Sequence, residues 1–337
     1  MCLRGTHSMV LYQAAYTGAL LWIVLCPYLF YTIIHKFSIK YLIINSVILF
    51  IICMTGTRYI AEIILPLWIA YIIYSLVELR KKQPEWRSEL ISQIKIIGII
   101  WVPALAGLGV YKWLTTWHNM NNNQLNMTLF VPSLEDCMHN VSILFQNVFS
   151  AFGYSGNVEL FSLRGIGNMV SIALCILIVF VVPVLQIKKI EDETELGKMF
   201  FYFTVVHNGI MITLAVFFAK TVDRYIFSSV FCIVILSARY IMKYWVNSPN
   251  IFRYLILSAF AGIITINSFL MIGNSCNWRE TLESEKQVNL ELQQKGLKKG
   301  YATYWNAYNN QIYSNDMIQY GAITMTENGM IPFKWLV

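Results

Sequence analysis

Long apolar runs dominate this chain and decide what it can fold into. Of its residues, 57% are hydrophobic and only 13% are charged, a balance that excludes an ordinary water-soluble domain. A helix needs about 20 apolar residues to cross the hydrocarbon core of a bilayer. The pattern predicts an all-α polytopic membrane protein with about eight transmembrane helices. The predicted spans are Leu11–Ile34, Tyr41–Met54, Tyr59–Leu76, Ile94–Leu114, Met169–Ile187, Met199–Ala219, Tyr225–Met242 and Phe252–Ile272.

The second and third predicted spans are short, and only the four residues 55–58 separate them. Two interpretations of this region stay open. The two runs form separate membrane helices, or together they form a single re-entrant hairpin.

The placement of lysine and arginine predicts how the chain is oriented in the cell membrane. The loops after the first, third, fifth and seventh spans hold Lys36, Lys40, Arg80, Lys81, Lys82, Arg87, Lys188, Lys189, Lys198, Lys243 and Arg253. The alternate loops hold single cations, namely Arg58, Arg164, Lys220 and Arg224. By the positive-inside rule, both termini and the loop 115–168 are extracytoplasmic. The net charge of +7 implies contact with anionic membrane lipid, and nothing in the chain suggests binding to nucleic acid.

The loop 115–168 is the only long internal segment that is neither lipid-like nor strongly basic. From Phe130 to Phe152 its apolar residues recur at helical spacing. We therefore predict an amphipathic helix that either lies flat on the membrane surface or packs over the protein's own helix bundle. Four predicted spans precede this loop and four follow it, so we expect a ligand outside the bilayer to meet it.

Beyond Ile272 the chain changes character, which divides it into a transmembrane domain, 1–272, and a segment 273–337. Asn277–Gly300 is a charged helical stretch that Gly296 or Gly300 is expected to stop. The aromatic-rich remainder predicts short strands, with turns at Asn309-Asn310, Ser314–Asp316 and Glu327–Gly329. Together these parts make a small α/β-like extracytoplasmic segment. We also expect the chain to be part of a longer protein, because its apolar end lacks a polar tail.

Charged side chains at the ends of spans are candidates for function because their burial is costly. Arg58 and Glu62 lie four residues apart at the outer end of the third span, on one helix face. They form an interfacial ion pair, or they place a cation for a phosphate group at the membrane surface. Asp223 and Arg224, before the seventh span, allow the same two interpretations.

Three further sets of polar residues lie within spans or in the outer loop and are candidates for structural or functional roles. His207 and Asn208 lie within the sixth span, where interhelical hydrogen bonding is a commoner role than catalysis. Glu135 and Asp136 are solvated loop charges or candidates for a general base. Arg239, near the cytoplasmic end of the seventh span, is interpreted as a side chain that snorkels to the interface.

Known catalytic and metal-binding motifs are missing from the sequence. It holds no nucleotide-binding glycine loop, HExxH motif, nucleophile elbow or metal-ligand spacing. The cofactor therefore stays unknown, with a divalent cation considered but no ligand cluster evident. Cys137 and Cys276 both fall outside the predicted spans and could form a disulfide in an oxidising compartment.

The sequences Thr57-Arg58-Tyr59-Ile60 and Asp223-Arg224-Tyr225-Ile226 repeat an Arg-Tyr pair at the outer start of a span. With the long outer loop and the tail after the last span, which contains Gly300–Ala307, this arrangement resembles the C-terminal part of class C glycosyltransferases. These multi-span enzymes, bacterial ones among them, use polyprenyl-phosphate sugars. The resemblance implies that Arg58, Tyr59, Asp223, Arg224 and Tyr225 bind the phosphate of the lipid carrier.

In that family the catalytic base is an acidic residue of the first outer loop, whereas no acidic residue precedes Glu62 here. The catalytic residue is therefore unknown, with Glu62, Glu135 and Asp136 as candidates. The leading hypothesis is a membrane glycosyltransferase, or the C-terminal portion of one, that moves a sugar from a polyprenyl-phosphate carrier to an extracytoplasmic acceptor. The alternatives are a cell-envelope polysaccharide polymerase or ligase, and a transporter or flippase of a lipid-linked sugar without chemistry.

Overall fold

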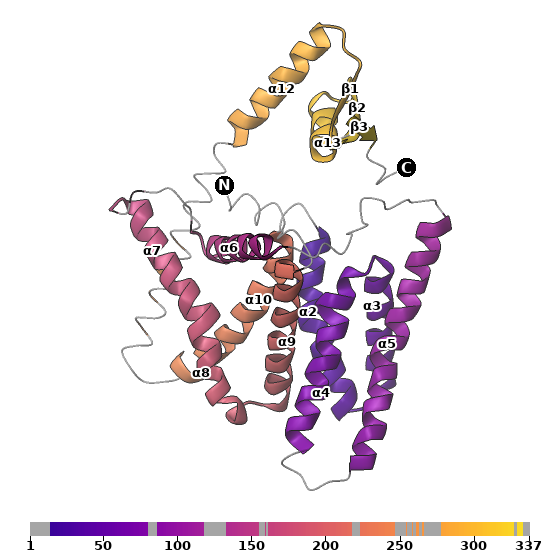
Figure 1. The fold of residues 1–337 in the computed structure, drawn as a ribbon, viewed down its shortest axis with the longest axis vertical. Coiled ribbons are helices and arrows are strands. Elements are labelled where there is room, and N and C mark those ends of the chain that lie inside the picture. Colours follow the sequence, from indigo (N-terminus) through magenta and orange to yellow (C-terminus); the bar gives the residue numbers. More distant parts are fainter. Residues whose placement is uncertain are drawn as a thin grey trace. The chain divides into compact units, whose positions relative to one another are not determined.

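The computed structural model describes residues 14–79, 86–117, 133–154, 159, 161–217, 223–246, 254, 258, 261–262, 265, 278–326 and 329–332. The chain divides into two compact units (Figure 1). The membrane unit comprises 1–114 and 127–263, and the second unit comprises 115–126 and 264–337. Each unit is described by itself.

The membrane unit consists of helices, several of which contain π-helical turns. Its elements are α2 (Ala14–His35), α3 (Ile39–Met54), η1 (Ile60–Ile64), α4 (Leu65–Leu79), α5 (Trp86–Trp117), α6 (Leu134–Ala151), α7 (Leu163–Ile176), η2 (Leu177–Val181), α8 (Val182–Lys188), η3 (Ile190–Asp192), α9 (Glu195–Phe217), α10 (Asp223–Tyr240) and η4 (Ile241–Val246). Of these, η1, η2 and η4 are π-helical, and η1 and η2 continue directly into α4 and α8.

Six helices among the described residues are long and apolar enough to cross a membrane, which makes this a multi-pass membrane protein. The predicted second span corresponds to α3, which is apolar but shorter, at 16 residues. The predicted eighth span, Phe252–Ile272, lies almost wholly outside the described residues. The predicted class is therefore confirmed, and the count of eight stays a prediction.

A tight reversal joins α3 to η1, and both interpretations of this region, two membrane helices or a re-entrant hairpin, stay predictions. Gly56 has a φ of 145°, a value that L side chains rarely adopt. The Thr55 hydroxyl donates to the carbonyl of Ile52 at 2.7 Å and closes the end of α3.

The largest core cluster joins α2, α3, η1, α4, α5, α9 and α10. Its fully buried side chains include Phe30, Leu67 and Phe203. At Gly107 a Cβ atom would collide with the carbonyl oxygen of Phe50, so the backbones of α5 and α3 are in close contact.

Helix α6 lies across the ends of α9 and α10 (Figure 1). A capping box begins it, in which the Ser133 hydroxyl accepts from Asp136 N while Asp136 Oδ2 accepts from Ser133 N. The Asn140 amide donates to the carbonyl of Val216 at the end of α9, at 3.1 Å. The predicted amphipathic helix is confirmed within Leu134–Ala151, and residues 130–132 lie outside the described part of the chain.

One face of α6 packs on the bundle, as the second of the two interpretations predicted. Leu144 and Val148 contact the cluster that contains Ile226 and Val230 of α10. Met138, by contrast, is 67% exposed.

The second unit is a small α/β fold, in agreement with the predicted α/β-like segment. Its described elements are α12 (Trp278–Gln294), β1 (Lys299–Thr303), α13 (Tyr304–Tyr313), β2 (Gln319–Thr326) and β3 (Gly329–Pro332). In the sheet, β2 lies in the middle, parallel to β1 and antiparallel to β3.

Gly296, with a φ of 72°, ends α12. The amides of Gly296 and Leu297 donate to the carbonyls of Gln293 and Leu292, which is a Schellman motif. The prediction of a stop at Gly296 is therefore confirmed.

The predicted turn at Asn309-Asn310 is wrong, because both residues lie inside α13. Asn310 Oδ1 accepts a hydrogen bond from the Asn289 amide of α12, so a tertiary contact outweighs the local preference of asparagine for turns. Asn289 also accepts a hydrogen bond from the Tyr320 hydroxyl at 2.8 Å, and burial raises the pKa of Tyr320. The predicted turn at Ser314–Asp316 is confirmed, with positive φ at Asn315 and Asp316.

Candidate functional site

The Arg58–Glu62 pair is the most deeply buried of the predicted charged sites whose side chains the structure describes. Arg58 Nε lies 2.6 Å from Glu62 Oε1, and the two side chains are 26% and 1% exposed. An exposed ion pair would contribute little to stability, but a carboxylate buried inside a membrane unit depends on its partner. The structure therefore confirms the Arg58–Glu62 ion pair and adds that the Glu62 side chain is buried in the bundle.

A π-helical turn and a proline together explain how Glu62 is held. Glu62 lies within η1, and Pro66 follows it by four residues. In an α-helix the N–H of residue 66 would donate to the carbonyl of residue 62, but proline has no N–H. His207 of α9 supplies a donor instead, with its Nδ1 atom 2.7 Å from the carbonyl oxygen of Glu62. His207 is thus the interhelical hydrogen-bonding residue that its position predicted.

This hydrogen bond also places a proton on Nδ1 of the imidazole ring, because a carbonyl oxygen can only accept. With the proton on Nδ1, the Nε2 atom of neutral His207 carries a lone pair. Neither His207 Nε2 nor Glu62 Oε2 has a hydrogen-bond partner among the described residues, and both residues are fully buried. Buried polar atoms without partners are rare and point to strain or function. The site therefore offers two acceptors that can receive a proton or the hydroxyl group of a ligand.

The acidic residues of the outer loop lie elsewhere, on α6. Asp136 accepts hydrogen bonds from the backbone and hydroxyl of Ser133, at 3.0 and 2.7 Å, so it caps the helix. Glu135 is exposed in the same turn. Glu135 is therefore a solvated charge, and Asp136 serves as a helix cap.

The other residues predicted to bind the carrier are placed only in part. Tyr59 directly precedes η1 and packs against the main core cluster. Asp223, Arg224 and Tyr225 form the first turn of α10, but their side chains lie outside the described part of the structure. Asn208 donates to the carbonyl of Thr204 within α9, at 2.8 Å.

A second charged cluster, which the sequence did not predict, surrounds Glu193. Glu193 has a fully buried side chain, and Arg239 Nη2 lies 2.9 Å from its Oε2 atom. Lys243 Nζ lies 3.4 Å from the other carboxylate oxygen. The Arg239 guanidinium thus binds a carboxylate of the bundle, and the snorkelling of its side chain to the membrane interface stays a prediction. Gly197 makes room for this contact, since a Cβ there would lie 2.8 Å from Arg239 Cζ.

Metal-binding and disulfide chemistry gain no support from the described residues. No group of three His, Cys, Asp or Glu side chains there is placed to hold a metal ion. Cys137 is a free thiol, and Cys276, its predicted partner, lies outside the described residues.

The fold and the site thus define a multi-pass membrane protein with a buried acidic centre. Comparison with protein-family models, curated proteins and solved structures finds no match to this chain.

Proposed function

We propose that this protein is a membrane glycosyltransferase, or the C-terminal portion of one, that takes a sugar from a polyprenyl-phosphate carrier. The observation that carries the proposal is the carboxylate of Glu62, which is buried inside the membrane unit and held by Arg58. A buried ionisable residue in a membrane bundle is by default a candidate for function. The resemblance to class C glycosyltransferases supplies the donor.

In the proposed reaction, an acceptor hydroxyl oxygen attacks the anomeric carbon of the sugar. The new bond forms as the bond from that carbon to the phosphate oxygen breaks, and the electron pair of the broken bond leaves with the phosphate. Glu62 Oε2 accepts the proton of the hydroxyl as general base. Arg58 supplies positive charge for the departing phosphate. The product is the glycosylated acceptor together with the free polyprenyl phosphate.

The orientation is part of the same proposal, with both termini and α6 outside the cytoplasm. Two observations support it. Lys198, Arg239 and Lys243 gather around Glu193, which follows η3, and Glu195, which begins α9. Helix α6 contacts the opposite end of α9, at Val216. The cation-rich end would face the cytoplasm, following the positive-inside rule.

The direct test is transfer of labelled sugar from polyprenyl phosphate by the purified full chain in proteoliposomes. We expect release of free carrier in the wild type. Arg58→Lys should lower the rate, because lysine keeps the charge but not the planar geometry that binds carboxylate and phosphate. Lys112→Arg on α5 serves as a control for an exchange between the same two residue types. An Arg58→Lys rate equal to the wild-type rate would refute the phosphate assignment.

Proton-coupled transport of a lipid-linked sugar is a second candidate, favoured by a separate observation. Glu62 Oε2 and His207 Nε2 are buried acceptors without partners in the described structure, as a residue pair that takes up a proton would be. The same proteoliposomes separate the two candidates. Movement of the intact lipid-linked sugar between leaflets, dependent on a pH gradient and without release of carrier, favours transport.

A further inference from the structure

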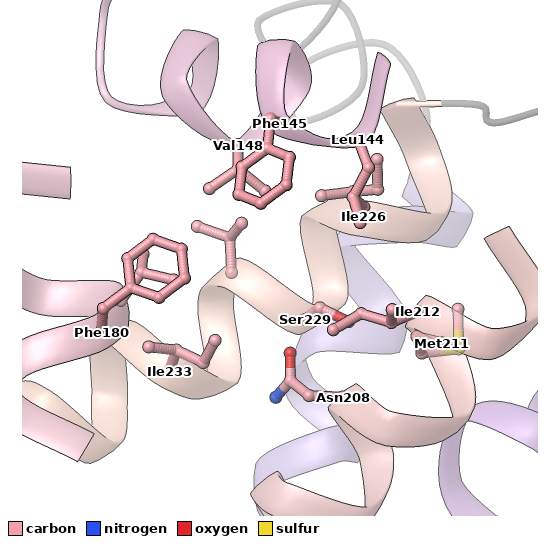
Figure 2. A pocket seen from close by; sticks show the side chains of 12 residues that line it. Leu144, Phe145, Val148, Phe180, Asn208, Met211, Ile212, Ile226, Ser229 and Ile233 are labelled. Atoms are coloured by element: carbon pink, nitrogen blue, oxygen red, sulfur yellow. The ribbon is translucent and has the colours of Figure 1, made fainter. Parts of the chain in front are cut away.

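An apolar pocket lies between α6 and the helices beneath it (Figure 2), and neither Arg58 nor Glu62 lines it. Its cavity volume is about 120 Å³, and the pocket opens to the surroundings of the protein. Side chains of α6, η2, α9 and α10 form its walls, and they include Leu144, Val148, Phe180, Ile212, Ile226 and Ile233. Mostly apolar walls with a small number of polar groups are typical of ligand-binding pockets.

Two polar side chains interrupt the apolar wall. Figure 2 shows Asn208 and Ser229 near one another, on the side of the pocket opposite α6. The Asn208 amide already donates to the carbonyl of Thr204. Ser229 is only 6% exposed, and its hydroxyl has no hydrogen-bond partner among the described residues. A hydroxyl buried in an apolar wall is unfavourable unless something accepts its hydrogen bond.

The rim of the pocket faces the surroundings of the membrane unit. Phe145, Phe180 and Ile212 line the pocket and are 44–45% exposed. Phe180 and Ile212 belong to helices that are apolar enough to cross the membrane, so their exposed surfaces contact lipid chains. A hydrocarbon chain can therefore enter the pocket from the bilayer without crossing water.

We propose that this pocket binds one ester-linked acyl chain of a membrane glycerolipid, independently of the transferase activity. The chain would lie along the apolar wall while its ester carbonyl accepts a hydrogen bond from Ser229. Ser229 lies in the second turn of α10. It is roughly 9 Å along the helix axis from Asp223, the charged first residue of α10. Ser229 selects between hydrocarbon ligands, because an isoprenoid chain has no polar atom along its length and would leave the hydroxyl unsatisfied.

The test is photo-crosslinking of the full chain in nanodiscs. The probe is a phosphatidylcholine with a diazirine on one acyl chain, and labelled peptides are identified by mass spectrometry. We expect labelling within α6 and α10. Ile233→Trp, which fills the pocket, should reduce labelling at least fivefold. Val234→Trp is the matched control, because Val234 is exposed beside Ile233 and does not line the pocket.

A pair of serine variants keeps the proposal testable if Ile233→Trp does not fold. Ser229→Ala should reduce acyl-probe labelling about fivefold, as expected for the loss of one hydrogen bond, while Ser228→Ala should not. Absence of labelling within α6 and α10 would overturn the proposal. Equal labelling of the pocket by a diazirine-bearing polyprenyl phosphate, unaffected by Ser229→Ala, would also overturn it and assign the pocket to the carrier.

Discussion

Replacing His207 by leucine tests how the functional centre is built. The substitution removes the His207 Nδ1 donor to the Glu62 carbonyl, to which Pro66 has no N–H to offer. A buried carbonyl without a partner costs about 1–3 kcal/mol, so we expect a loss of this size in the free energy of unfolding. His207→Asn is the control, because its side-chain amide carries a donor close to the position of Nδ1 and should lose less.

The second half of this test is a double-mutant cycle with Pro66→Ala. Alanine returns an N–H at the fourth residue after Glu62, and we expect this turn to become α-helical so that the N–H donates to the Glu62 carbonyl. In this background His207→Leu should cost about 1–2 kcal/mol less than in the wild-type chain. The assay is denaturant unfolding of the purified full chain in one detergent, followed by tryptophan fluorescence. Costs that add to within about 0.5 kcal/mol would refute the coupling between the proline and the histidine.

Three further predictions concern other parts of the chain. Gly107→Ala should overpack the contact between α5 and α3 and lower the free energy of unfolding by about 1–3 kcal/mol. Gly109→Ala, with open space around it, should not lower this free energy. Equal effects of the two substitutions in denaturant unfolding would contradict the close helix contact. Arg239→Ala should lower the free energy of unfolding of the membrane unit because it removes a partner of buried Glu193. Adding Glu193→Gln should recover part of this loss. Additive effects of the two substitutions on the free energy of unfolding would argue against the ion pair. Burial raises the pKa of Tyr320, so its contribution to the second unit is present below about pH 10 and is lost as the pH rises further. Limited proteolysis of the C-terminal unit should show this alkaline loss in the wild type but not in Tyr320→Phe.

The membrane helices were predictable because hydropathy alone governs which segments enter a bilayer. The predicted span Met199–Ala219 corresponds to α9, Glu195–Phe217. The start differs because the first turn of α9 is helical but not apolar, and hydropathy detects only the apolar part. In the second unit, local turn preference failed at Asn310, whose amide oxygen bonds to α12 instead.

Only those contacts of the candidate site that join residues close in the sequence could be predicted. The four-residue separation of Arg58 and Glu62 predicted their contact, which the structure confirms. The burial of Glu62 and its link to His207 were not predicted, because the two residues are 145 positions apart. One local signal was available in the sequence. Pro66, four residues after Glu62, has no N–H, so in an α-helix the Glu62 carbonyl would need another donor.

The role of Glu62 as general base is tested by comparing Glu62→Gln with Glu135→Gln in the sugar-transfer assay. Both substitutions exchange a carboxylate for its isosteric amide, but only Glu62 is buried beside Arg58, whereas Glu135 is exposed on α6. If Glu62 is the general base, Glu62→Gln lowers the transfer rate by about 10²–10⁴-fold, and Glu135→Gln leaves it unchanged. Transfer at the wild-type rate by a folded Glu62→Gln protein would contradict the account.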